Sequence, residues 1–147
     1  MKKIIVILLV AMLSTTSISA NADKASEKVL KVFKEAFPDA DNPSWFSYDT
    51  YYMVYFKASE ECSCRIFYDT EGKILKTQRY YSAAELSPFI KSKVNEKYPG
   101  MKITGVTEIN SDESLVYHII LQDDKKILYI NSDARGEINL EEKLNKE

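Results

Sequence analysis

The sequence predicts an α+β fold: two helix-plus-antiparallel-β-meander units in tandem (α-β4-α-β4), with the helices packed on one face of the sheet. Two observations support this prediction. Each half of the chain begins with apolar residues at helical spacing and continues with the alternating pattern of strands. The stretch "FYDTEGKI" (67–74) is also matched by "NSDARGEI" (131–138), and both indicate a hairpin with an Asp-x-x-Gly turn.

No linker rich in Gly, Pro or Ser separates the two halves. We therefore expect a single domain, residues 23–147, built of two pseudo-repeats at about 25–81 and 82–141 with their sheets joined.

Residues 1–22 have the layout of a secretory signal peptide. Two lysines precede an apolar run from Ile4 to Leu13, and small residues follow up to Ala22. This run of about ten residues is shorter than the roughly 20 that a membrane-spanning helix needs. Cleavage after Ala22, or after Ala20 as the alternative, predicts a periplasmic or secreted protein without stable membrane insertion.

The charge balance excludes one class of partner. Without the two signal-peptide lysines, 18 basic residues remain against 22 acidic ones, a net charge of −4. A mildly acidic chain offers no basic patch for nucleic acid or for an anionic membrane surface. We expect no nucleic-acid partner.

The first helix is predicted from Ser26 to the proline at 38, which disfavours helical geometry in the residue before it. Its apolar residues fall on one face. They are Val29, Leu30, Val32, Phe33, Ala36 and Phe37. The period then changes to two, and aromatic and β-branched residues predict four strands. These are 43–49, 51–59, 62–69 and 73–81.

The second helix is predicted to start after Ser87, which is placed as the N-cap, with Pro88 at the first helical position. Ser82 to Glu85 also fits a capping box, but Pro88 would then lie inside the helix, so we expect a short turn there. A proline at 99 ends the helix. Four further strands follow, at 102–109, 114–122, 125–131 and 136–142.

Together these landmarks resemble the PepSY-like family of bacterial exported proteins, whose tandem units look like those of the β-lactamase inhibitory proteins. The resemblance spans nearly the whole mature chain. It rests on "AFP" (36–38), Trp45, "YxVxF" (52–56), "YDTEGK" (68–73), "LSPFI" (86–90), "YP" (98–99) and the second "YxIxL…DARG". It implies helices packed on antiparallel sheet, a binding or inhibitory role and no cofactor. The second half has no tryptophan matching Trp45, so the two halves need not bind alike.

Aligned on these landmarks, the strands present two faces, because strand side chains alternate. The inner face, which can take the helices, carries Tyr52, Val54, Phe56, Ile66, Tyr68, Tyr117, Ile119, Leu121, Leu128 and Ile130. The outer face carries Tyr51, Met53, Tyr55, Arg65, Phe67, His118, Ile120 and Tyr129. A face that met only water would be polar, and this one is not.

Few residues suggest chemistry. His118 is the only histidine, no serine-based or cysteine-based motif accompanies it, and one histidine with one cysteine pair makes a complete zinc site improbable. Paired carboxylates at 60–61, 112–113 and 123–124 fall in predicted turns, and those at 141–142 near a frayed C-terminus. We expect solvated turn residues, no catalytic residues and no metal site.

Cys62 and Cys64 lie two residues apart in a chain expected to enter an oxidising compartment. In a regular strand, residues i and i+2 are roughly 6.6 Å apart. Bridged Cβ atoms need about 3.5–4.5 Å. Two partly buried thiols, a strained disulfide at a bulge or turn, and a metal or redox role stay open.

The outer face has two interpretations. Either the sheet curls or another element covers it, with cross-strand pairs stabilising it, or it is a protein-binding face, since Tyr, Trp and Arg are enriched among residues that dominate binding energy. We predict an exported non-enzymatic binding module that binds or inhibits an unidentified exported or envelope protein. Its predicted binding residues are Tyr51, Met53, Tyr55, Arg65, Phe67, His118 and Tyr129.

Two other functions remain. A carrier or sensor for a lipid, peptide or aromatic molecule would need an internal cavity of roughly 300–1,000 Å³ between sheet and helices. A hydrolase using Glu60, Glu61 or His118 would need one of these side chains in a cleft with a perturbed pKa.

Overall fold

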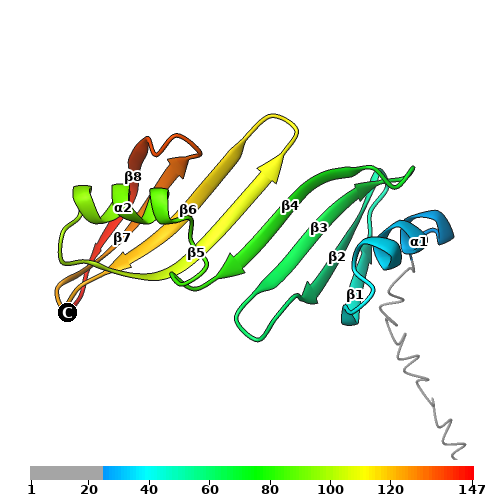
Figure 1. The fold of residues 1–147 in the computed structure, drawn as a ribbon, viewed down its shortest axis with the longest axis horizontal. Coiled ribbons are helices and arrows are strands. Elements are labelled where there is room, and N and C mark those ends of the chain that lie inside the picture. The colour runs from blue at the N-terminus through cyan, green and yellow to red at the C-terminus, as the bar shows by residue number, and fades with distance from the viewer. Residues whose placement is uncertain (1–24) are drawn as a thin grey trace, which may run out of the picture.

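The computed structural model describes residues 25–147 (Figure 1), and the predicted signal peptide lies outside this range. The first helix and four strands are α1 (Glu27–Ala36), β1 (Asp41–Ser47), β2 (Tyr51–Lys57), β3 (Ser63–Asp69) and β4 (Ile74–Tyr81). They are followed by α2 (Pro88–Lys97), β5 (Lys102–Ser111), β6 (Leu115–Gln122), β7 (Lys126–Asp133) and β8 (Ile138–Asn145). Each predicted helix and strand therefore exists.

The predicted fold class is wrong in its organisation. The eight strands form one continuous antiparallel sheet in the order β1 to β8, with only two helices in the described range, and not a tandem of two helix-plus-four-strand units (Figure 1). The connection is the β4–β5 pair, which is hydrogen-bonded from Lys76↔Ser111 to Tyr81↔Val106. The physical reason is that this ladder gives hydrogen-bond partners to the backbone N–H and C=O groups that the edges of two separate four-stranded sheets would leave unpaired.

Both helices start and stop where the sequence predicts. Ser26 caps α1, its side chain accepting a hydrogen bond from the Val29 amide, and the chain leaves the helix at Phe37. Ser87 occupies the N-cap position of α2 with proline after it, but its side chain makes no capping hydrogen bond. Ser87 thus occupies the predicted N-cap position but does not make the side-chain hydrogen bond that a capping serine usually makes.

The predicted inner face is the core of the protein. The Phe33 ring of α1 lies 5.2 Å from those of Trp45 and Phe56, and α2 contributes the buried Ile90 and Val94. Figure 1 shows α1 beside the β1 end of the sheet and α2 in front of the last strands. Of the ten residues predicted for this face, nine are buried and Tyr52 packs against them. Both helices therefore pack on the inner face, and within residues 25–147 no helix covers the outer face.

The two predicted Asp-x-x-Gly turns are confirmed. The Asp69 carboxylate accepts hydrogen bonds from the amides of Glu71 and Lys73 at 2.9 Å, and Gly72 has φ +88°. In the second turn Asp133 has the same role, and Gly136 has φ +81°. Aspartate closes each turn and glycine takes the left-handed backbone conformation at low cost.

Candidate functional site

Five predicted outer-face residues are brought together on the paired strands β2 and β3. Met53 lies opposite Phe67 and Tyr55 opposite Arg65, while Tyr51 lies opposite Asp69 at the end of the ladder. The Tyr51, Met53, Tyr55 and Phe67 side chains are partly exposed, and Arg65 is exposed. Alternation along the two strands therefore builds one aromatic surface on the side away from the helices.

Ring stacking extends this surface past its predicted border. Tyr48 stacks on Tyr51 with ring centroids 4.4 Å apart and an interplanar angle of 16°, and Tyr51 in turn lies 6.0 Å from Phe67. Phe46 on β1 is opposite Met53 and is 45% exposed. Offset aromatic contacts of this kind hold large side chains in place at a surface.

Polar contacts order the centre of the surface. The Tyr55 hydroxyl donates to Ser63 Oγ at 3.2 Å. Arg65 donates to the Tyr80 hydroxyl at 3.2 Å, and that hydroxyl donates to Gln78 Oε1 at 3.0 Å. Each of these side chains gives up freedom before any partner arrives, which lowers the entropy cost of binding.

His118 and Tyr129 form a second group on the same face. They lie on β6 and β7, so three strand spacings, about 14 Å, separate His118 from Arg65 on β3. His118 Nδ1 is 3.2 Å from Glu141 Oε2, and the Asn131 amide donates to Glu141 Oε1 at 3.0 Å. The hydrogen bond from Asn131 and then the one with His118 lower the pKa of the Glu141 carboxyl.

A row of cross-strand partners joins the two groups. Tyr80 on β4 lies opposite Thr107 on β5, which lies opposite His118 on β6. The predicted site residues therefore share one continuous face, although they do not form a single cluster.

Several residues of this face were not predicted from the sequence. Lys76, Gln78 and Tyr80 alternate along β4 and point to the outer side, a signal that the period-two pattern of that strand already contained. Glu141 was placed near a frayed C-terminus, and this was wrong, because β8 stays paired with β7 as far as Asn145.

No family model matches the chain, and no curated protein matches it. Solved structures do match. A DUF2874 family protein from Bacteroides ovatus aligns with a TM-score of 0.62 and 19% identity, covering 84% of this chain and 89% of that one. A BLIP-like protein from Bacteroides fragilis aligns with a TM-score of 0.61 and 16% identity, covering 83% of this chain and 86% of that one.

A third match, from Bacteroides eggerthii, has a TM-score of 0.61 and 16% identity and covers 83% of this chain and 89% of that one. Its name assigns it provisionally to the periplasm, which supports the predicted periplasmic or secreted localisation. The protein thus has a BLIP-like fold. At these identities the likeness establishes the fold alone.

The two cysteines are free and buried on the inner side. Their sulfur atoms are 4.0 Å apart, with Cys62 at the end of the β2–β3 loop and Cys64 in β3. Burial, followed by the neighbouring Cys62, raises the pKa of the Cys64 thiol to about 11. Of the three alternatives, the structure has the pair of thiols, and the raised pKa keeps the Cys64 thiol protonated at neutral pH.

The residues of the hydrolase alternative do not converge. Glu60 and Glu61 are exposed in the β2–β3 loop, where Glu61 accepts a hydrogen bond from Ser82 at 3.1 Å, while His118 is on β6. Within residues 25–147, no three His, Cys, Asp or Glu side chains gather as a metal site would require. No helix of the described range is long and apolar enough to cross a membrane.

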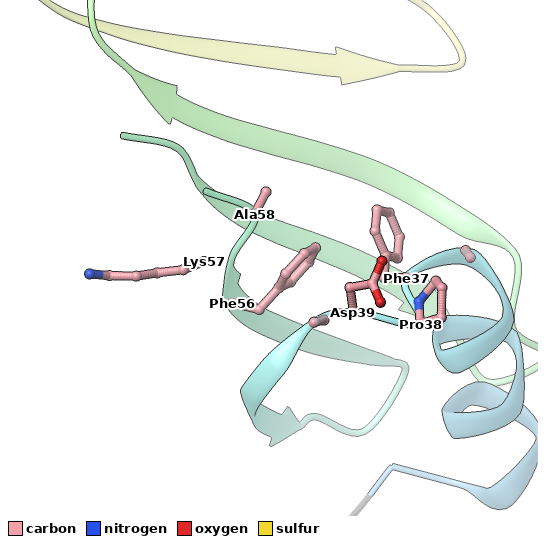
Figure 2. A pocket seen from close by; sticks show the side chains of 8 residues that line it. Phe37, Pro38, Asp39, Phe56, Lys57 and Ala58 are labelled. Atoms are coloured by element: carbon pink, nitrogen blue, oxygen red, sulfur yellow. The ribbon is translucent and has the colours of Figure 1, made fainter. Parts of the chain in front are cut away.

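Two hollows lie beside α1. One, of about 240 Å³, is lined by apolar residues that include Leu30, Phe33 and Trp45. The other, of about 200 Å³, is lined by Phe37 and Phe56, whose ring centroids are 5.0 Å apart. Figure 2 shows this hollow, with the Lys57 side chain pointing away from it. Both are smaller than the roughly 300–1,000 Å³ of typical ligand sites.

Two larger hollows, of about 350 and 380 Å³, are open to solvent and lined mainly by polar and charged residues, such as Lys93, Glu96 and Lys97 beside α2. None of the four is an enclosed apolar cavity between sheet and helices, so they do not favour the carrier alternative.

Proposed function

We propose that the protein is an exported, non-enzymatic module that binds, or inhibits, another exported or envelope protein through the outer face of its sheet. We also propose its assignment to the PepSY-like family. The observation that carries the binding function is the set of exposed and half-buried aromatic side chains on the helix-free face, continuous from Phe46 on β1 to Phe67 on β3.

The composition of this face supports protein binding. Tyr51, Tyr55 and Phe67 supply large apolar area with few rotatable bonds, Arg65 supplies directional hydrogen bonds, and Met53 adapts its shape. Residues of these types, clustered and partly desolvated, are those whose truncation most often costs 2 kcal/mol or more of binding free energy. Tyr129 and His118 offer a second contact area further along the face.

The test is capture of partners from the exported fraction of the producing cell on immobilised protein, followed by titration of the captured partner in solution. Wild type is compared with Tyr51→Ala/Tyr55→Ala. Phe89→Ala is the matched control, because it removes a 51% exposed aromatic ring from α2 on the opposite side. All three proteins are first shown to have the same thermal stability.

We expect a partner that wild type and Phe89→Ala retain and that the double variant loses. A partner retained equally by the double variant, or lost only with Phe89, would refute the assignment of the binding face. The complete absence of a partner in repeated captures would also count against the proposal.

A further inference from the structure

The guanidinium group of Arg65 is held at the centre of the outer face by two tyrosines. Its carbon lies 5.9 Å from the centroid of the Tyr55 ring and 5.3 Å from that of Tyr80. The Tyr80 hydroxyl accepts one guanidinium hydrogen bond at 3.2 Å and is itself fixed by donating to Gln78. Cation–π contacts and one hydrogen bond thus orient a charge that stays at the surface.

Most of the hydrogen-bonding capacity of Arg65 is unused. A guanidinium has five N–H donors, and the structure gives Arg65 a single side-chain hydrogen bond, to a neutral hydroxyl. Within residues 25–147, no carboxylate lies in ion-pair distance of it. Arg79, on the inner side of the next strand, differs, because it pairs with Glu85 at 3.0 Å and with Glu108 at 3.5 Å.

A second cation of the same kind lies next to Arg65. Lys76 Nζ is 4.3 Å from the centroid of the Phe67 ring and also has no ion pair in the described part of the chain. Lys76 lies opposite Phe67, and Gln78 lies opposite Arg65. The two cations are therefore diagonal cross-strand neighbours, with backbones roughly 7–8 Å apart.

The outer side of β2, β3 and β4 carries no acidic residue between these two cations. The residues between and around them in the register are Met53, Tyr55, Ser63, Phe67, Gln78 and Tyr80. Asp69 lies beyond Phe67 at the end of the β2–β3 ladder, where its carboxylate accepts hydrogen bonds from the Glu71 and Lys73 amides. The negative charges of Glu141 and Glu142 lie at the far end of the same sheet, on β8. The acidic residues of the outer face thus lie outside the Arg65–Lys76 pair, at the end of the β2–β3 ladder and on β8.

We propose that Arg65 and Lys76 bind the carboxylates of an acidic segment in the partner protein, with Tyr55, Tyr80 and Phe67 forming the walls around them. This inference rests on the proposed function and names the chemistry of its partner. A planar guanidinium with free donors matches a carboxylate in a bidentate fashion, and the surrounding rings keep water from the pair.

An acidic protein segment fits better than an anionic membrane or polymer. An extended anionic surface is recognised by many clustered cations. At this end of the face Arg65 and Lys76 are embedded among rings, and Lys57 at the end of β2 is the one further cation on the outer side of β2, β3 and β4. Glu141 and Glu142 on the same face would also be repelled by such a surface. A protein segment can place carboxylates at one end only.

The experiment uses a defined probe: a phage-displayed library of random dodecapeptides selected on the full protein. Sequences enriched by wild type are synthesised, and their dissociation constants are measured against four variants. These are Arg65→Gln/Lys76→Gln, Arg65→Lys, Tyr51→Ala/Tyr55→Ala, and the control Lys34→Gln/Lys91→Gln. The control removes two exposed positive charges from the helices and so matches the change in net charge.

We expect peptides enriched in Asp and Glu. Their affinity should fall at least tenfold in Arg65→Gln/Lys76→Gln and with rising salt concentration, and it should be unchanged in the control. Arg65→Lys should give an intermediate loss, because it keeps the charge and loses the bidentate geometry. Should the double variant fail to fold, Lys76→Gln alone and Arg65→Lys still carry the test.

Three outcomes would overturn the inference. The first is the selection of neutral peptides that lose affinity in Tyr51→Ala/Tyr55→Ala but not in Arg65→Gln/Lys76→Gln. This result would support the binding face and contradict the acidic partner. Peptides insensitive to both double variants would contradict the face itself. Binding of phosphatidylglycerol vesicles that requires Arg65 and Lys76, with no peptide selected, would assign the two cations to a membrane surface.

Discussion

Two tyrosine hydroxyls on the inner face have opposite surroundings. Tyr81 donates to Glu108 Oε2 at 2.7 Å. The Tyr68 hydroxyl is fully buried and finds no hydrogen-bond partner in the described range, and burial raises its pKa to about 12. An unpaired buried hydroxyl costs about 1–3 kcal/mol, whereas a paired one contributes about 1 kcal/mol.

Phenylalanine substitution should therefore change stability in opposite directions at these two sites. Tyr68→Phe is expected to raise the free energy of unfolding by about 1 kcal/mol, because it removes a polar atom with no partner. Tyr81→Phe is expected to lower it by about 1 kcal/mol or more, because it removes the donor to Oε2 of the half-buried Glu108 and leaves that carboxylate only the longer contact with Arg79. Urea unfolding of both variants measures the difference. Equal destabilisation by the two changes would contradict this account.

The carboxyl of Glu141 provides a second test at the residue scale. Its pKa lies below the ordinary value, chiefly through the hydrogen bond from Asn131 and secondly through His118. The stabilisation that it provides is therefore present above the unfolded pKa and is lost as the pH falls through the lower, folded pKa. Asn131→Ala should move the pKa up toward the ordinary value by more than His118→Ala does. A carbon-13 NMR titration of the carboxyl resolves the two shifts, and the reverse ranking would make the histidine the main cause.

At the scale of single elements, alternation predicted the strands well, and its failures have local causes. The first strand was expected at 43–49 and lies at Asp41–Ser47, where the ladder shifts register between Asp41 and Ser44. Asn42 has φ +46° in this irregular segment, a conformation that no hydrophobic pattern records. The final strand begins with apolar alternation at Ile138 and Leu140 only, so its extension to Asn145 followed from pairing with β7 and not from its own residues.

Pattern also predicted where the outer face of the sheet would lie, but not all of its residues. The aromatic residues of β2 and β3 were identified because their neighbours alternate strictly. The role of Tyr80 depends on a cross-strand contact with Arg65, and that of Glu141 on contacts with β6 and β7. Such contacts depend on register, which short sequence windows do not encode.

Two glycines test how tightly a turn is packed. Gly72 and Gly100 have similar positive φ values, +88° and +80°, so alanine at either site carries the same backbone strain of about 1–2 kcal/mol. A Cβ at position 72 would also lie 3.3 Å from Val32 Cγ2 in α1, whereas nothing lies within 4 Å at position 100. Gly72→Ala should therefore destabilise the protein more than Gly100→Ala in chemical denaturation. A larger effect at position 100 would mean that the β3–β4 turn does not pack against α1.

At the scale of the whole molecule, the predicted tandem organisation failed because strand pairing is non-local. The repeated turns and helices were visible in the sequence, but nothing in either half states that β4 and β5 pair along their length. Side chains reinforce this pairing, with Arg79 on β4 contacting Glu108 on β5 and Tyr81 donating to the same carboxylate. The sheet and its outer face are continuous as a result.

A continuous sheet should unfold as one cooperative unit. Trp45, the only tryptophan, reports on α1 and β1, whereas Ile90 lies on the buried side of α2, against the other end of the sheet, and is 1% exposed. Ile90→Ala should destabilise the protein by about 2–5 kcal/mol through the cavity that it leaves. The midpoint of the Trp45 fluorescence transition should fall as far as that of the circular dichroism signal of the whole sheet.

The control is Lys91→Gln, at the exposed neighbouring position, and it should change neither of these two midpoints. If the fluorescence midpoint stayed in place while the circular dichroism transition split, the two ends of the sheet would unfold independently and the β4–β5 ladder would not couple them.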